Sequence, residues 1–408
     1  MTPGARLSAA IELLDAILAG EPAERALTRW ARASRFAGSK DRAAIRDAVF
    51  DALRRRRSLG HLGGSDTGRA LVLAQSALDG ADLAALFSGE GFGPAPLADG
   101  ERAALAADPA AAPRAVRLDV PDHVEAALAA ALGEAFEPIM AAMQSRAPVD
   151  LRVNTLKTNA GAATVVLARD GILAEPHPLA PHALRVVQNP RHVAQSRAYT
   201  QGMVELQDVA SQYVAAEAGA RPGMSVLDYC AGGGGKTLAL AAAMASEGRL
   251  LAHDADPRRM KDLPARARRA GASLEILPPG DAPPGPCDVV LVDAPCSGTG
   301  AWRRKPEGKW RLSPAWLARF PRLQDAILDE ASAHVRPRGT LAYATCSLLA
   351  CENGERARAF LARHPGWSLD FERSLTPLDG GDGFYVARLR APAGRQGRRS
   401  LLINHGHA

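Results

Sequence analysis

The N-terminal part of the chain carries its apolar residues at helical spacing. Ile45, Val49 and Leu53 recur every four positions, and Ser39 stands where a helix would begin. Ala- and Leu-rich segments of the same kind continue beyond them, broken by short Gly- and Pro-rich stretches. This pattern predicts an all-helical domain over residues 1–143.

The pattern changes after this helical part. Residues 150–154 and 184–187 have the character of short strands, and the segment 160–169 between them has helical spacing. The sequence therefore predicts a small α/β module over residues 144–215.

Further along, apolar runs of strand length alternate with helical stretches. The predicted strands lie at 225–229, 249–253, 274–277, 289–293 and 340–345. This alternation is typical of an α/β doubly wound, Rossmann-like sheet, in which ligands bind at the carboxyl ends of the strands. We expect this domain to occupy residues 216–390, and the basic, Gly-containing segment 391–408 to be a mobile tail.

The composition is that of a folded protein, with 47% hydrophobic and 23% charged residues, and 408 residues suffice for two or three domains. The formal net charge is +6, and Arg supplies most of the positive charge because Lys is rare. Arginine suits bidentate contacts with phosphate, which indicates a nucleic-acid partner. A compositional bias of the source genome would explain the same excess, so charge alone leaves the partner open.

The sequence indicates a cytoplasmic protein. The N-terminal apolar stretch 9–18 is interrupted by Glu12 and Asp15, unlike a signal peptide. The longest apolar run, near 238–245, is far shorter than the roughly 20 residues that a membrane span needs. We therefore expect no membrane association. The sequence leaves the oligomeric state open, with a monomer as the default expectation.

A glycine-rich turn follows the predicted strand that ends near Asp228. Its consecutive residues are Cys230, Ala231, Gly232, Gly233, Gly234, Gly235, Lys236 and Thr237. Glycines let the backbone approach a ligand closely, and the amides at the start of the next helix favour an anionic group such as a carboxylate or a phosphate. The turn therefore predicts a cofactor site at the carboxyl edge of the sheet.

The ending Gly-Lys-Thr also completes the phosphate-binding loop GxxxxGK[ST], but Cys230 occupies the position of that pattern's first glycine. Asp254 closes the next predicted strand, 254 − 235 = 19 residues after Gly235, where an acid that binds ribose hydroxyls is expected. Together these features favour an adenosyl cofactor over a triphosphate. A tight turn without a ligand is the alternative for the glycines taken alone.

The chain has five cysteines, at positions 230, 287, 296, 346 and 351, and no two form a CxxC pair. This spacing argues against a metal site or a disulfide framework and predicts free thiols. Cys296 and Cys346 each follow the end of a predicted strand, in Asp293-Ala-Pro-Cys and Thr-Cys-Ser. We expect both at the edge that carries the glycine turn, and we interpret the other three thiols as core.

Two thiols and a carboxylate at one edge suit methylation of a pyrimidine at carbon 5. That carbon is a poor nucleophile until carbon 6 has been attacked, and a thiolate is the natural attacker. A second thiol or an activated water would then remove the carbon 5 proton, and Asp293 would hydrogen-bond the N3 and amine side of cytosine. The chemistry by itself does not decide which cysteine has which role.

Several segments together resemble the RsmB/Nol1/Nop2/Sun family of RNA 5-methylcytosine methyltransferases. They are 37–54, 152–157, 207–212, 230–237, 293–296, 303–310, 323–324, 345–347 and 381–384. The pattern is most similar to the bacterial small-subunit branch. That resemblance implies a NusB-like helical domain, a small RNA-recognition module, S-adenosylmethionine as the methyl donor and 16S rRNA as the partner, with the target base drawn out of its stack.

The resemblance also implies roles for single residues. Cys346 would be the nucleophile, and Cys296 the residue that releases the product. Asp254, Asp281 and Asp293 would contact the cofactor, as would the glycine turn, and Asp293 would also face the cytosine.

This chain departs from the family motifs at three positions. Gly232 and Gly233 replace an Ala-Pro pair, and Cys351 stands where the family more often shows an acid. Glycine is sterically milder, so we expect cofactor binding to survive. Three other functions stay open: an RNA-binding or antitermination factor on a NusB-like domain, a phosphate-binding-loop NTPase, and a methyltransferase that acts on tRNA.

Overall fold

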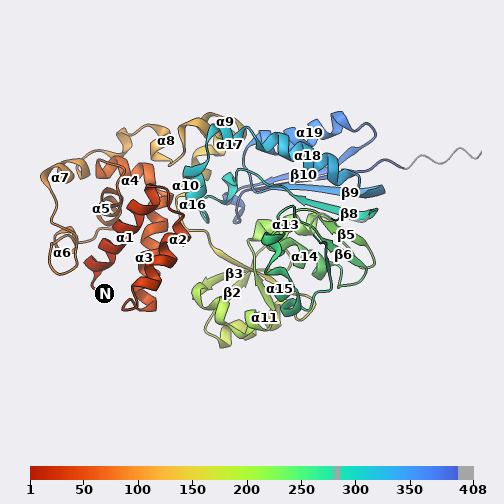
Figure 1. Ribbon diagram of the computed structural model, residues 1–408, viewed down its shortest axis with the longest axis horizontal. Helices are drawn as coiled ribbons and strands as arrows, with labels where there is room; N and C mark the ends of the chain where they lie inside the picture. Colours follow the sequence, from red (N-terminus) through yellow and green to blue (C-terminus); the bar gives the residue numbers. More distant parts are fainter. Residues whose placement is uncertain (279–280, 282–284, 394–408) are drawn as a thin grey trace, which may run out of the picture.

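The computed structural model describes residues 1–278, 281 and 285–393. Within them the chain forms a helical region, a small antiparallel sheet and a large mixed sheet, which lie side by side (Figure 1). The segment 394–408, expected above to belong to a mobile tail, lies outside the described residues.

The N-terminal region is helical, as the spacing predicted, and residues 1–143 contain no strand. Its helices are α1 (Pro3–Leu18), α2 (Ala23–Ala33), α3 (Ser39–Arg54), α4 (Arg56–Gly63), α5 (Gly68–Leu78), α6 (Leu83–Leu86), α7 (Asp99–Leu105), η1 (Pro109–Ala111), α8 (Arg114–Arg117), α9 (Asp122–Leu132), η2 (Gly133–Ala135) and α10 (Phe136–Met143).

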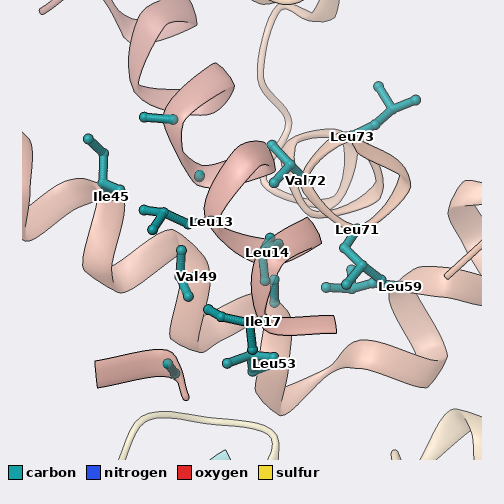
Figure 2. Packing of buried hydrophobic residues seen from close by; sticks show 14 of the residues in the cluster. Leu13, Leu14, Ile17, Ile45, Val49, Leu53, Leu59, Leu71, Val72 and Leu73 are labelled. Carbon is teal, nitrogen blue, oxygen red and sulfur yellow. The ribbon is translucent and has the colours of Figure 1, made fainter. Parts of the chain in front are cut away.

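The core of this region forms where α1, α3 and α5 meet. Leu14, Val49 and Leu71 are fully buried there, among other aliphatic side chains (Figure 2). Each such side chain contributes about 1.5–3 kcal/mol of transfer free energy on burial. Because these residues recur at helical spacing, the same pattern that predicts the helices also builds the core that holds them together.

The small sheet has the strand order β2-β3-β1-β4 and is antiparallel at each pairing. Its elements are β1 (Val149–Val153), α11 (Ala160–Arg169), β2 (Leu173–Pro176), β3 (Ala183–Gln188), η3 (Pro190–Gln195), α12 (Arg197–Thr200) and β4 (Val204–Leu206). The predicted strands β1 and β3 and the predicted helix α11 are confirmed. The short edge strands β2 and β4 were not predicted.

The large sheet has the order β10-β11-β9-β8-β5-β6-β7. Its elements are α13 (Val209–Glu217), β5 (Ser225–Asp228), α14 (Gly235–Ala243), β6 (Arg249–Ala252), η4 (Pro257–Met260), α15 (Leu263–Ala270), β7 (Glu275–Ile276), β8 (Cys287–Asp293), η5 (Thr299–Ala301), α16 (Pro306–Arg311), α17 (Pro314–Leu317), α18 (Phe320–Ser332), β9 (Val335–Thr345), η6 (Ala350–Glu352), α19 (Gly354–Arg363), β10 (Ser368–Leu375), η7 (Pro377–Asp379) and β11 (Phe384–Arg390).

The five strands from β5 to β9 are parallel, and they are the five that the sequence predicted. β11 pairs antiparallel to β9, and β10 pairs antiparallel to β11 at the edge. The sequence pattern did not predict this hairpin, because β10 is largely exposed and carries polar residues along most of its length. α18 and α19 cover one face of the sheet, and α13 and α14 lie on the other (Figure 1).

The helical region meets the large-sheet domain at α16. Lys309 Nζ donates to the carbonyl of Arg54 (3.0 Å), and Trp310 Nε1 donates to the carbonyl of Leu53 (2.6 Å). In return, Arg54 Nε donates to the carbonyl of Arg303 (2.7 Å). The last carbonyls of α3 have no partner within the helix, so these bonds satisfy them and fix the helical region beside the segment that follows β8.

Buried ion pairs join the small sheet to the large one. Arg304, from the segment after β8, pairs with Asp382 (2.6 Å) and also approaches the buried Asp150 of β1 (4.0 Å). Arg185 of β3 pairs with Asp150 (2.6 Å) and donates to the Gly380 carbonyl (2.6 Å) of the large-sheet domain. Because these charges lie largely out of water, removing one partner would leave the other buried and unpaired. The ion pairs therefore constrain how the two sheets are placed relative to each other.

One segment, Asp122–Met143, has the length and apolar composition of a membrane-spanning helix. It does not form one helix, because α9 ends and Gly133 adopts a φ of +56° before α10 begins. Its apolar residues Phe136 and Ile139 are buried in a cluster that also contains Trp302. Packing within the protein accounts for part of its apolar character, since 28% of the apolar window is buried.

Candidate active site at the carboxyl edge of the large sheet

The glycine turn lies at the carboxyl edge of the large sheet, between β5 and α14. Gly232 and Gly234 have positive φ angles of +52° and +80°. A Cβ atom on Gly234 would lie 2.3 Å from Leu263 Cδ1, so this position requires glycine. α14 begins at Gly235, which leaves its first amides at this edge of the sheet.

Asp254 follows β6 and is held against the glycine turn. Its Oδ2 accepts hydrogen bonds from the Gly232 N–H (2.8 Å) and from the Arg259 guanidinium (3.0 Å). The residue is 6% exposed, so the carboxylate has little freedom to move. The structure thus brings Asp254 and the turn together, as the sequence predicted.

Asp228, the last residue of β5, is fully buried next to the turn. Its Oδ2 accepts from the Thr237 hydroxyl (2.7 Å), whereas Oδ1 has no hydrogen-bond partner among the described residues. Burial raises the pKa of this carboxyl to about 7, although the Thr237 bond opposes it. The sequence predicted no role for Asp228, because its position at the end of a predicted strand was the only indication of a function.

Acidic and basic side chains are paired around the turn, Asp254 with Arg259 and Asp293 with Lys236. Asp228, Asp254 and Asp293 interact electrostatically there, and Lys236 Nζ donates to Asp293 Oδ2 at 2.7 Å. Burial lowers the pKa of Lys236, but the charge and hydrogen bond of Asp293 outweigh burial, so its pKa is raised and the ammonium stays charged. The charges of Asp254 and Asp293 are therefore largely compensated by Arg259 and Lys236.

Cys296 and Cys346 lie side by side at this edge, in the turns that follow β8 and β9. Their Sγ atoms are 3.4 Å apart. The hydrogen bond between them lowers the pKa of the Cys346 thiol, whereas burial and the charge of Asp293 raise it. Lys236 and Lys305 lower it further, and the net shift is downward. The same bond, burial and the charge of Glu352 raise the pKa of Cys296. Two thiols in contact therefore differ in acidity, and Cys346 is the one that favours the thiolate.

A fully buried carboxylate, Glu352, connects the two cysteine turns. It accepts from the backbone N–H (2.8 Å) and the hydroxyl of Ser297, next to the first cysteine. It also accepts from the Ser347 hydroxyl (2.5 Å), next to the second, and from Gln324 Nε2 (3.1 Å). Glu352 was not predicted from the sequence as a functional residue, and its neighbour Gln324 was noted only as part of a family pattern.

A cavity of about 660 Å³ opens beside the two thiols. Asp293, Cys296 and Cys346 line it together with Trp302 and Arg259. Its volume is in the range of small-molecule sites, which are about 300–1,000 Å³. One bound ring could therefore contact both thiols and the carboxylate at the same time.

The remaining predicted residues lie elsewhere. Asp281 follows β7 and is exposed, its N–H donates to the Pro278 carbonyl (3.2 Å), and no hydrogen bond in the described residues joins it to the glycine turn. Cys287 is buried in the core of the sheet. Burial raises the pKa of the Cys230 and Cys351 thiols, which fits their interpretation as structural cysteines.

Comparison with known families gives two matches. Residues 219–390 match the family described as 16S rRNA methyltransferase RsmB/F, and residues 120–193 match the RsmF/B-like ferredoxin-like domain. Ribosomal RNA small subunit methyltransferase B of Erwinia tasmaniensis is 36% identical over 268 residues, and that of Cronobacter sakazakii is 35% identical. Each match covers 62% of this chain, and the chain spans 62% of the length of these curated relatives.

Solved structures share the fold. The crystal structure of PH0851 has a TM-score of 0.74 at 23% identity and covers 95% of this chain and 99% of that one. NSun6 from Pyrococcus horikoshii with SFG has a TM-score of 0.60 at 17% identity and covers 66% and 98%. The large-sheet domain therefore has a Rossmann-like methyltransferase fold. The sequence matches show that residues 219–390 resemble the RsmB/F methyltransferases and residues 120–193 the ferredoxin-like domain of the same proteins. These matches do not test the NusB-like character of the helical region, which stays a prediction.

Proposed function

We propose that this chain transfers a methyl group from S-adenosylmethionine to carbon 5 of a cytosine in RNA, through a covalent bond between Cys346 and carbon 6. The observation that carries this proposal is the 3.4 Å contact of Cys296 and Cys346 in one cavity with Asp293. A single structural cysteine needs no such partner, whereas this reaction needs two groups, one to attack the ring and one to help release it.

Cys346 acts first, as the thiolate. Its sulfur bonds to carbon 6, and the electron pair of the 5,6 double bond makes carbon 5 nucleophilic. Asp293 accepts a hydrogen bond from the exocyclic amine and so orients the ring. The Lys236 ammonium, which holds Asp293 in place (2.7 Å), offsets the negative charge that attack places on the N3 side. When bound, S-adenosylmethionine supplies the electrophilic methyl group.

Cys296 acts in the release. While Cys346 is a thiolate, Cys296 stays protonated and donates to it. Once the Cys346 sulfur is bonded to carbon, it is no longer anionic, so Cys296 loses its proton more readily. Cys296, or a water that it orients, then takes the proton from carbon 5. The bond between sulfur and carbon 6 breaks, and its electron pair returns to Cys346.

The glycine turn and its acids fit S-adenosylmethionine. Asp254 is positioned by the Gly232 N–H at 2.8 Å, as expected of a residue that binds ribose hydroxyls. Asp254 and Asp293, each paired with one cation, would offer carboxylate oxygens to the hydroxyl and ammonium groups of this cofactor. The family's motif at Cys230 to Lys236 supports the same assignment, and Asp281 is proposed as a contact by resemblance alone.

The names of the curated relatives support 16S rRNA as the substrate and thus a cytoplasmic place of action. In this proposal residues 1–143 form a NusB-like RNA-binding domain, 144–215 an RNA-recognition module and 216–390 the catalytic domain. The contact of α16 with the end of α3 links RNA bound by the helical region to the cysteine cavity.

Methyl transfer to an in vitro transcript of 16S rRNA tests this function. With tritiated S-adenosylmethionine we expect the full chain to label the transcript, and bisulfite sequencing to find 5-methylcytosine at defined positions. Asp293→Asn should abolish the label. Calorimetry should detect S-adenosylmethionine and not ATP. Tight ATP binding would contradict the proposal. So would labelled RNA in which bisulfite sequencing finds no 5-methylcytosine.

A further inference from the structure

An apolar strip continues from the cysteine cavity to the protein surface. Trp316, Phe320 and Leu323 line the same cavity as Cys296 and Cys346, on the side formed by α17 and α18. Trp316 is 57% exposed and Leu323 is 44% exposed, which is unusual for large apolar side chains beside a reaction centre. The part of the cavity near the thiols is therefore polar, and its rim is aromatic and aliphatic.

The indole of Trp316 is held in place. Its ring centroid lies 6.2 Å from that of Phe320, with an interplanar angle of 85°, the edge-to-face geometry that aromatic pairs favour. Its backbone N–H donates to the Ser313 side chain at 3.2 Å, which caps α17. A fixed aromatic ring with more than half of its surface exposed is ready to stack on a planar group.

Two cations stand on the same wall. Lys305 and Arg319 line the cavity, both are exposed, and neither has a carboxylate within ion-pair distance among the described residues. The preceding arginines, Arg303 and Arg304, differ because both are paired with Asp382. The rim thus has positive charge available for an anion beside an aromatic face.

We propose that this rim is a second nucleotide site, which binds the unpaired nucleotide next to the target cytosine. The base of that nucleotide stacks on Trp316, and its phosphate lies between Lys305 and Arg319. This inference rests on the proposed RNA substrate. It adds that the rim holds the neighbouring part of the RNA strand while the target base lies in the cavity. An acidic peptide segment would use the two cations but would not need the indole.

The test is a binding cycle with short single-stranded RNA. The probe is a uridine heptamer with one central cytosine, and in two further probes the base on the 5′ or the 3′ side of that cytosine is removed. We expect one of these two abasic probes to bind the wild-type chain about tenfold more weakly. Trp316→Ala should weaken the intact probe about tenfold and should show no further loss with that abasic probe.

Three further variants make the result specific. Trp316→Phe should restore most of the affinity, because phenylalanine also stacks. Arg319→Gln should reduce the slope of log affinity against log salt by about 0.7, the value for one phosphate contact on a single strand. Leu369→Ala, which removes a 38% exposed apolar side chain from the edge strand β10, is the control and should bind as the wild type does.

Two results would overturn the second site. The first is that Trp316→Ala binds the intact probe as tightly as the wild type does. The second is that Trp316→Ala loses as much affinity on removal of the neighbouring base as the wild type does, which would make the two effects independent. Competition by polyglutamate that is equally effective against the wild type and Trp316→Ala would assign the rim to an acidic peptide instead. These outcomes are distinct from failure of the proposed function, in which the wild-type chain itself transfers no methyl group to the 16S transcript.

Discussion

The turn that carries Cys296 and the turn that carries Cys346 are built alike but surrounded differently. Each follows a parallel strand, β8 or β9, and each is tied by a serine to Glu352. Negative charge from Glu352 raises the pKa of Cys296, after the effects of its neighbour thiol and of burial. Positive charge from Lys236 lowers the pKa of Cys346, in addition to the hydrogen bond from Cys296.

This difference shows how one cavity can give two identical thiols different tasks. The hydrogen bond between the thiols is the largest cause of both shifts, since it raises the pKa of Cys296 and lowers that of Cys346. Glu352 and Lys236 add to this difference, whereas burial and Asp293 raise the pKa of Cys346. Lys236, from the helix after the glycine turn, holds Asp293 (2.7 Å) and also lowers the pKa of Cys346. The comparison can be tested by changing each turn in isolation.

The largest expected effect comes from removing the proposed nucleophile. Cys346→Ala should lower kcat/KM for methyl transfer by at least about 10⁴-fold, as loss of a covalent nucleophile does in other enzymes. Cys351→Ala, a thiol change in the same loop, is the matched control and should retain activity. Equal losses in the two variants would contradict a special role for Cys346.

Cys296→Ala should also stop turnover, but at a later step. Attack on carbon 6 remains possible while release is blocked, so we expect a covalent protein–RNA adduct that survives denaturing gel electrophoresis. The double variant Cys296→Ala with Cys346→Ala should form no adduct. An adduct in the double variant would show that the order of the two cysteines is wrong.

Glu352→Gln should disturb both turns at once. It removes a charge that raises the pKa of Cys296, and it places an amide among donors that all need an acceptor. We expect kcat to fall about 100-fold, and the free energy of unfolding of the catalytic domain to fall by about 1–3 kcal/mol. Chemical denaturation measures the second quantity. Unchanged kcat at equal stability would remove Glu352 from the proposed mechanism.

Lys236→Met should act mainly on Cys346. Without the ammonium, the pKa of the Cys346 thiol rises, so the thiolate forms at a higher pH. The rate at pH 7 should then fall about tenfold for every pH unit by which this pKa increases. The pH dependence of iodoacetamide alkylation, followed by mass spectrometry, measures the pKa of the thiol directly. A midpoint that moves to lower pH would reverse the assigned direction.

The smallest effect is expected from Lys305→Gln. Lys305 is exposed and lowers the pKa of Cys346 from a solvated position, where water screens its charge. The alkylation midpoint should rise by less than in Lys236→Met, and high salt should reduce the difference from the wild type. A rise as large as that of Lys236→Met would mean that Lys305 is less solvated than its exposure indicates.

Much of the fold could be predicted because local pattern and tertiary role agree. The helical spacing around Val49 predicts both α3 and its buried face. β5, β6, β8 and the second part of β9 are apolar runs that are buried in the sheet, whereas β7 is a short edge strand with an exposed glutamate. β10 could not be predicted in this way, because an edge strand with exposed polar residues has no apolar pattern of its own.

The sequence by itself determined which residue types come together, since the carboxyl ends of parallel strands share one edge and place the glycine turn, Asp293 and both cysteines there. Only the tertiary structure decided how they differ. The pairing of the thiols at 3.4 Å, the buried bridge through Glu352 and the approach of Lys236 depend on residues far apart in the chain. The pKa of each thiol depends on its burial and on charges from other parts of the chain, and the spacing of residues along the sequence predicts neither.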